Sequence, residues 1–469
     1  MIQLPNVSSL TALIYGSLAF PIAMLGYPIG AYIPRLYSTE MGISLTTIGL
    51  VIMAAAIMDA VTDPIMGHFS DRWRTPWGRR RPWILIGLPL WLVVVWLLLN
   101  PSVGVTAFYL VFFFLAMRVC STIFTLPYIA WGLELSSDYH ARTMIQSARE
   151  KFVLAGLLAA AAMVLFSEQV FGRADAGYVL FSISLVVVIL TPIAAALVLW
   201  RVPEVPNFNA PKISMAEGAS RMFRNRIFGR LLLIELLIAG GENFRNTLSL
   251  LFIQDYIGLP RVGSALLLYF GAGLIAIPFW DWLAKRWGKH QALAAAMVLV
   301  GAVSIGVLTV RDGELMKFYT LFALKGFCFG AFAYLPRAML ADVVDLDTIR
   351  SGAARPANYY AILGFMTKCA ASFGGLSLPI LALVGYSTAA DAINGPTELM
   401  WLGILYGVVP TVVFVLAFYL SVTWPLTEEL HARVERILGK RYEQQMRRAQ
   451  GTAAATQASA AEINPPRAT

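Results

Sequence analysis

Residues 43–100 read ISLTTIGLVIMAAAIMDAVTDPIMGHFSDRWRTPWGRRRPWILIGLPLWLVVVWLLLN, two long apolar runs separated by a strongly basic connection. A helix of about 20 apolar residues crosses a bilayer, whereas a membrane-spanning strand needs only about ten residues of alternating character. Only helices and closed barrels satisfy their own backbone hydrogen bonds in lipid. The segment therefore predicts two membrane-spanning helices joined by a loop that stays in water.

The rest of the chain repeats this pattern. Of its 469 residues, 58% are hydrophobic and 13% charged, and the mean hydropathy is +0.68, values that contradict a water-facing surface. We predict an all-α membrane protein with twelve helices in two six-helix pseudo-repeats. The predicted helices span about 10–33, 43–70, 83–100, 105–132, 150–170, 178–200, 228–256, 263–284, 291–310, 317–345, 358–386 and 400–423.

This layout divides the chain into four parts. We predict an N-terminal six-helix bundle over 1–200, a central cytoplasmic loop over 201–227 and a C-terminal bundle over 228–423. A cytoplasmic tail follows over 424–469. Its first part is amphipathic and basic, which favours a helix that binds membrane lipid, and its Ala/Thr-rich end is predicted to be disordered from about 451.

The net charge of +9 is explained by topology. The predicted helices place 26 of the 36 Lys and Arg residues on one side of the membrane, five on the other and five within the spans. The positive-inside rule then puts both termini in the cytoplasm, in a multi-pass protein of the cytoplasmic (inner) membrane. The basic charge therefore gives no reason to expect nucleic-acid binding. We expect a functional monomer.

Several other classes of protein are disfavoured. Three cysteines within apolar runs give neither a disulfide framework nor a metal signature, and four scattered histidines give no metal-ligand spacing. A phosphate-binding G-x-x-x-x-G-K-[ST] motif is absent from the sequence. We expect no enzyme activity, no cofactor and no metal beyond a possible Na+. Two six-helix halves are instead the pattern of the major facilitator superfamily of transporters.

Three separated blocks narrow the family. Residues 59–83 read DAVTDPIMGHFSDRWRTPWGRRRPW, residues 126–152 read LPYIAWGLELSSDYHARTMIQSAREKF, and residues 335–368 begin LPRAMLADVVDLDTIRSG. In this order they resemble the glycoside-pentoside-hexuronide:cation symporter family, to which the melibiose carrier belongs. The resemblance extends over nearly all of the helical region and implies a major facilitator fold and cation-coupled transport of a small solute.

Asp59 and Asp63 form the first candidate site. Their i, i+4 spacing puts both carboxylates on one helix face, where the burial of two like charges needs a cation. The resemblance implies the same role for them, with Thr62 and Thr122 as neighbouring hydroxyl ligands. Hard oxygen ligands suit Na+, and a shared proton suits a raised carboxyl pKa equally well. Alternatively, Asp63 caps a kinked helix before Pro64 or pairs structurally with a lysine.

Two further groups of charges have candidate roles. The family places a lysine at the position of Lys368, facing the cation site across the bundle, where it can also be a structural ion-pair partner. The charged loop after the second helix is either an anion site or an inside latch, with acids of the second half as candidate partners. Its gating residues are Asp71, Arg72, Arg79 and Arg80, and the acids are Asp342, Asp345 and Asp347.

The chain departs from galactoside carriers in its substrate-binding residues. Helix 1 carries no carboxylate between Tyr15 and Ile33, and Thr125 stands at the acidic position of helix 4. Buried cations are present instead and suit an acidic substrate. The candidate substrate-binding residues are Arg245, Glu242, Asn243, Arg118, Lys368, Arg149, Tyr128, Arg337 and Lys325. The i, i+3 pair Glu242 and Arg245 can also simply neutralise itself, and buried aromatic residues often only pack the core.

We therefore predict a Na+- or H+-coupled symporter of a small polar solute, a glycoside, hexuronide or other organic acid. A lipid or steroid transporter of the same fold is an alternative, because helix 1 is unusually apolar. A non-transporting scaffold or sensor is another, and the Asp59/Asp63 pair argues against it, because a scaffold gains nothing from that buried repulsion.

Overall fold

The computed structural model describes residues 8–73, 75–136, 139–204, 225–311, 313–351, 356–389, 392 and 394–426, and every named element in these ranges is helical. Most of the predicted central loop and nearly all of the predicted tail lie outside them. The first transmembrane helix is divided into α1 (Ser9–Ser17), α2 (Ala19–Met24), α3 (Gly26–Arg35) and the π-helical η1 (Leu36–Glu40). Prolines at 21, 28 and 34 remove backbone donors along it.

The remaining helices follow the predicted order. In the first half they are α4 (Leu45–Arg72), α5 (Arg81–Leu99), α6 (Ala107–Glu134), α7 (Tyr139–Val170) and α8 (Ala176–Arg201). In the second half they are α10 (Arg226–Leu251), η2 (Phe252–Tyr256), α11 (Gly263–Trp287), α12 (Lys289–Val307), α13 (Leu315–Ser351), α14 (Pro356–Leu383), α15 (Pro396–Gly403), η3 (Ile404–Val408) and α16 (Val409–Val422).

The ends of these helices follow from local chemistry. The Ser44 hydroxyl accepts the Thr47 amide at 3.2 Å, and the Asp175 carboxylate accepts the Tyr178 amide at 3.0 Å, so both residues are N-caps. The largest departure from prediction is α7, which begins at Tyr139 rather than at about 150. The apolar pattern marks only the part of a helix that lies in lipid, so it does not reveal the polar turns that extend α7 before 150.

Eleven of the described helices are long and apolar enough to cross a membrane. The one predicted span outside these eleven is α10, which has 26 residues but carries five charged side chains. Two of these charges, Glu242 and Arg245, pair with each other, and Arg245 is buried inside the protein. Paired charges that face protein are tolerated at membrane depth. The twelve-helix prediction is therefore confirmed, with α10 as the most polar span.

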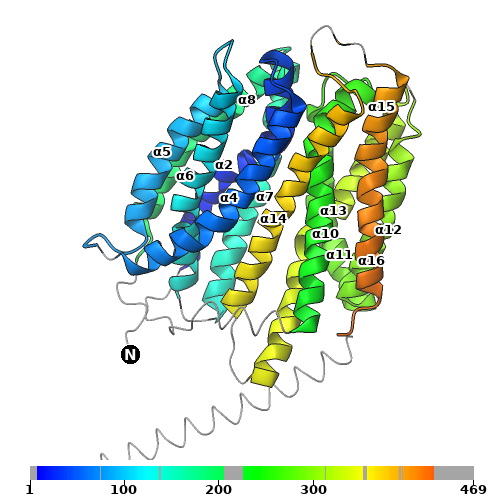
Figure 1. Ribbon diagram of the computed structural model, residues 1–469. Coiled ribbons are helices and arrows are strands. Elements are labelled where there is room, and N and C mark those ends of the chain that lie inside the picture. Colours follow the sequence, from blue (N-terminus) through cyan, green and yellow to red (C-terminus); the bar gives the residue numbers. More distant parts are fainter. Residues whose placement is uncertain are drawn as a thin grey trace, which may run out of the picture.

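The helices form two groups, the N-half (α1–α8) and the C-half (α10–α16), with α14 lying beside α4 at the seam between them (Figure 1). The two ends of the bundle are named here by a residue at each. The Arg35 end is where α3 ends and α4 begins, and the Arg80 end is where α4 ends and α5 begins. Helices α3 and α10, and α7 and α11, also meet across the seam.

The halves are packed together most closely at the Arg35 end. One core of buried residues runs through the N-half and continues into the Arg35 end of the C-half, whereas a second core lies wholly within the C-half. Gly49 of α4 and Gly375 of α14 meet at this end, where a Cβ on Gly49 would lie 2.4 Å from the Gly375 carbonyl oxygen. Only glycine permits that approach.

The outer surface of the bundle is apolar. Leu50, Ile193, Ile275, Leu383 and Val415 are among many large hydrophobic side chains that are exposed. So wide an apolar surface is unusual for a protein in water and is expected where lipid covers it.

Candidate functional site

A cluster of four charges lies near the middle of the seam. The Asp59 carboxylate, only 2% exposed, accepts a hydrogen bond from the Arg118 guanidinium of α6. The Asp63 carboxylate accepts one from the Lys368 ammonium of α14 and another from the Thr122 hydroxyl, the latter at 3.0 Å. Both carboxylates thus take part in one cluster, as their predicted place on one face of α4 requires. Its two acids are partnered separately, one within the N-half and one across the seam.

This pairing changes the roles predicted for Arg118 and Lys368. Both were predicted to contact substrate, and both are counter-ions of the two aspartates. A guanidinium stays charged at all physiological pH values, so Arg118 is a permanent positive charge beside Asp59. The Thr62 hydroxyl is buried and has no hydrogen-bond partner among the described residues. The Asp63 carboxylate and the Thr122 hydroxyl thus lie side by side, next to the Lys368 ammonium.

A separate cavity of about 210 Å3 lies between the halves. Its lining is mixed, with amide, hydroxyl, carboxylate and ammonium groups beside several aromatic rings. The lining residues are Gly26, Tyr27 and Leu157 from the N-half and Glu242, Asn243, Asn246, Ser249, Leu266, Tyr269, Phe270, Phe322, Lys325 and Phe329 from the C-half. The predicted substrate-binding residues Glu242, Asn243 and Lys325 are thus brought together here, and the ion-pair cluster is not part of this wall.

The polar wall of the cavity comes from one face of α10. Asn243, Asn246 and Ser249 recur every three residues and Glu242 lies four residues before Asn246, which aligns them along one side of the helix. Ser249 was not among the predicted substrate-binding residues. Its hydroxyl is hydrogen-bonded to the Tyr27 hydroxyl across the seam at 2.8 Å. A polar stripe in an otherwise apolar helix was the signal that could have identified it.

Arg245 lies behind this wall rather than in it. Its guanidinium is 1% exposed, pairs with Glu242, donates to the Ser304 hydroxyl at 2.7 Å and lies 5.4 Å from the Phe414 ring centroid. The predicted contact between Arg245 and substrate is therefore corrected. The i, i+3 alternative holds, and Arg245 neutralises and orients the Glu242 carboxylate.

Lys325 does reach the cavity. Its side chain is 6% exposed, and its ammonium donates to the Tyr406 hydroxyl at 2.7 Å. The same nitrogen lies 4.8 Å from the ring centroid of Tyr406, 5.0 Å from that of Phe322 and 5.3 Å from that of Tyr269. Aromatic faces attract a cation, so these rings form a box around the ammonium.

Three predicted substrate residues lie elsewhere. The Tyr128 hydroxyl donates to the Tyr15 carbonyl at 2.6 Å, and the two rings stack at 4.7 Å, so Tyr128 packs the N-half core. Arg149 pairs with the neighbouring Glu150 at 2.8 Å. Arg337 is exposed and donates to the Ala333 carbonyl at 2.9 Å. These three are not among the residues that line the cavity.

The predicted latch residues have partners other than those expected. Arg79 and Arg80 both pair with Glu134 at the end of α6, and the backbone amides of both donate to Glu204. In the C-half, Lys289 pairs with Asp342 of α13. Each loop is thus held within its own half, because the end of α6 or α13 lies beside it. Arg72 is exposed and Asp345 is half-buried, whereas the Asp71 side chain lies outside the described part of the chain.

Polar contacts cross the seam at the Arg35 end. The Arg35 guanidinium donates to Asp255 at 2.7 Å, and the Tyr386 hydroxyl donates to the same carboxylate. Burial, and then the Asp255 charge, raises the pKa of Tyr386, so the phenol keeps its proton. Glu168 of α7 is 2% exposed and accepts the Val262 and Gly263 amides at the start of α11, at 2.7 and 2.9 Å. The Arg35 and Glu168 contacts join the halves at this end, and Tyr386 supports Asp255 from within the C-half.

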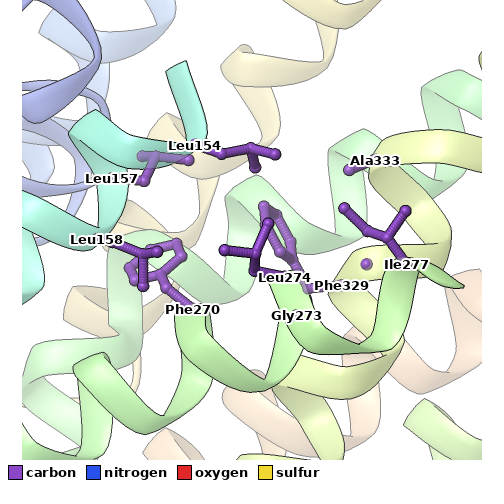
Figure 2. A pocket seen from close by; sticks show the side chains of 10 residues that line it. Leu154, Leu157, Leu158, Phe270, Gly273, Leu274, Ile277, Phe329 and Ala333 are labelled. Atoms are coloured by element: carbon purple, nitrogen blue, oxygen red, sulfur yellow. The ribbon is translucent and has the colours of Figure 1, made fainter. Parts of the chain in front are cut away.

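An apolar recess adjoins the cavity. Leu154, Leu157 and Leu158 of α7 face Phe270 and Leu274 of α11 across it (Figure 2). It holds only about 10 Å3, room for at most one water molecule, and its lining offers a water no charged side chain. The recess is part of the packing between α7 and α11, not a ligand site.

The chain is similar in sequence and in fold to known membrane transporters. A family profile described as "MFS/sugar transport protein" matches residues 14–428. The chain is 26% identical to the putative glycoside/cation symporter YagG of Escherichia coli, with 91% of this chain and 92% of that protein covered. It is 23% identical to the sodium-dependent lysophosphatidylcholine symporter 1-B of Danio rerio, covering 85% and 83%. The fold is similar to that of the nucleoside transporter NupG, at a TM-score of 0.64 and 13% identity, covering 88% and 99%.

Proposed function

The chain belongs to the MFS/sugar transport protein family, and from that premise we propose that it is a symporter, which uses a Na+ or H+ gradient to accumulate a small polar solute. The two helix groups act as the halves that rock about the solute in this superfamily architecture. The cavity of about 210 Å3 between them is the proposed solute site.

The proposal includes an orientation. We place the Arg80 end in the cytoplasm, because the connections at that end carry most of the Lys and Arg residues of the loops. The Arg35 end then faces the opposite side of the cytoplasmic membrane. The contacts of Arg35 and Glu168 across the seam support a conformation that is closed on that side.

The observation that carries the proposal is the pair of Asp63 and Lys368, which joins α4 to α14 across the seam. A coupling cation that binds Asp63 displaces the Lys368 ammonium and so removes one link between the halves. The cation changes the relative stability of the two conformations only through such a differential contact. The unpartnered Thr62 hydroxyl and the Thr122 hydroxyl supply further oxygen ligands.

We expect Asp63→Asn to abolish gradient-driven uptake and to leave some solute exchange. The reason is that the neutral amide no longer links cation binding to the seam, while the solute cavity is intact. Counterflow and gradient-driven uptake by reconstituted protein, with a panel of glycosides and organic acids, measure the two activities separately. Glu314→Gln, in an exposed loop pair with Lys317, is the matched control. Normal accumulation by a correctly folded Asp63→Asn protein would contradict the assignment.

A second candidate solute class is an amphiphile, favoured by the similarity to a lysophosphatidylcholine symporter. The cavity argues for the smaller solute, since pockets for drug-sized ligands measure about 300–1,000 Å3 and this one is below that range. Lysolipids in the same counterflow panel distinguish the two classes.

A further inference from the structure

The cations within the spans are not equally neutralised. Arg118, Lys368 and Arg245 each pair with a carboxylate. Arg337 is exposed, so solvent or lipid headgroups stabilise its charge. Lys325 is the fifth, and no ion pair joins it to a carboxylate within the described ranges. Glu242, the acid that lines the same cavity, is already the partner of Arg245, so Lys325 lies beside the cavity without a carboxylate of its own among the described residues.

The aromatic box does not fully stabilise this charge. A cation–π contact contributes up to about 2 kcal/mol when it is desolvated, whereas burying an ammonium costs several kcal/mol. The ammonium has three N–H donors, and Tyr406 is its one hydrogen-bond acceptor among the described residues. Because Lys325 lines the cavity, the remaining donors are available to a group that enters it.

We propose that Lys325 binds the negatively charged group of the solute, so that the solute is a small organic anion with a carboxylate. This inference rests on the proposed transport function and names its substrate class. The rest of the cavity suits a hydroxylated or unsaturated ring attached to that carboxylate. Asn243, Asn246 and Ser249 offer hydrogen bonds, and Tyr27 and Phe270 offer ring faces.

Charge balance gives the arrangement a physical reason. An anion at Lys325 and a coupling cation at Asp63 together add no net charge to the membrane interior, where unpaired charges are costly. The anion neutralises Lys325 and the cation neutralises Asp63, at two separate sites. A neutral solute would leave the Lys325 ammonium without a counter-ion.

Equilibrium binding to the purified protein tests the proposal with two matched pairs of probes. Methyl β-D-glucuronide is compared with methyl β-D-glucoside, and benzoate with benzyl alcohol, by titration calorimetry. We expect at least one carboxylate to bind about tenfold to a hundredfold more tightly than its neutral counterpart, as a charge-assisted hydrogen bond predicts. Lys325→Gln removes that difference, whereas Lys325→Arg keeps a preference for the anion.

Lys317→Gln is the control, because Lys317 lies on the same helix but pairs with Glu314 in an exposed position. If Lys325→Gln fails to fold, Lys325→Met takes its place, since it is apolar and of similar length. Equal affinity for charged and neutral probes overturns the proposal, as does failure of both carboxylates to bind or a preference that survives removal of the ammonium. Gradient-driven uptake is measured separately. Lys325-dependent binding without accumulation contradicts symport and supports the anion site.

Discussion

For Asp59 and Asp63, the sequence predicts where the side chains lie on the helix but not which residues they bind. The i, i+4 spacing predicts correctly that both acids lie on one face of α4, because helix geometry is local. The partners Arg118 and Lys368 come from α6 and α14, and no local pattern specifies which helix lies against that face. The partner of Arg245 is local, by contrast, and its i, i+3 spacing from Glu242 already offered the pair as the alternative to a substrate contact.

At this scale we expect Arg118→Gln to destabilise the protein by about 3 kcal/mol, because it leaves the Asp59 carboxylate buried without a cation. The double variant Asp59→Asn/Arg118→Gln recovers most of that loss, since neither charge remains. Thermal unfolding in detergent measures both, with Lys317→Gln as a surface-pair control. Equal unfolding temperatures for the single and double variants would show that the pair contributes little.

Among the elements, α10 and the charged loops show how far pattern predicts structure. The apolar pattern predicts all twelve spans, α10 included, and the one-sided distribution of loop charges is consistent with that number, although α10 is more polar than the other eleven. The loop residues Arg79 and Arg80 were predicted to bind acids of the other half. They bind Glu134 of their own half, and Lys289 binds Asp342 in the same way in the C-half. The charged loop after the second helix was visible in sequence, whereas the acid that each loop meets depends on packing.

We expect Glu134→Gln to loosen the loop over 75–81, because it replaces a shared carboxylate acceptor by a neutral amide that binds Arg79 and Arg80 more weakly. Hydrogen–deuterium exchange of this segment should become faster than in the wild type, with exchange around Lys289 unchanged. Asp342→Asn should make exchange around Lys289 faster and leave exchange of residues 75–81 unchanged. If both variants exchange as the wild type does, these carboxylates are not what holds the loops.

At the scale of the whole molecule, the two halves are joined by contacts of different kinds at different depths. The Arg35–Asp255 pair and the Glu168 cap lie at one end, and the Asp63–Lys368 pair lies near the middle. The first two fix the closed state of the Arg35 end, and the third depends on cation binding. The relative stability of the conformations therefore depends on a small number of polar contacts.

Removal of one such contact should shift the equilibrium. We expect Arg35→Gln to favour opening at the Arg35 end several-fold, since the loss of ~1–3 kcal/mol of a cross-half contact changes populations by that order or more. Spin labels at Val103→Cys and Met316→Cys, exposed positions of opposite halves at this end, report the separation in a background without native cysteines. An unchanged distance distribution would contradict a gating role for Arg35.

The contact between Gly49 and Gly375 bears on how fast the halves exchange. Interdigitated side chains must leave and re-enter their holes when two helices move past each other, which makes such interfaces switch between discrete packings. The backbones of α4 and α14 approach each other directly here, with only the Pro379 ring beside Gly49 and the Met53 side chain beside Gly375, so few side chains have to repack when the helices separate at this point. The activation enthalpy of the conformational change then comes mainly from breaking polar contacts and less from repacking. Turnover should accordingly depend less steeply on temperature than in a carrier whose halves meet through large interlocking residues.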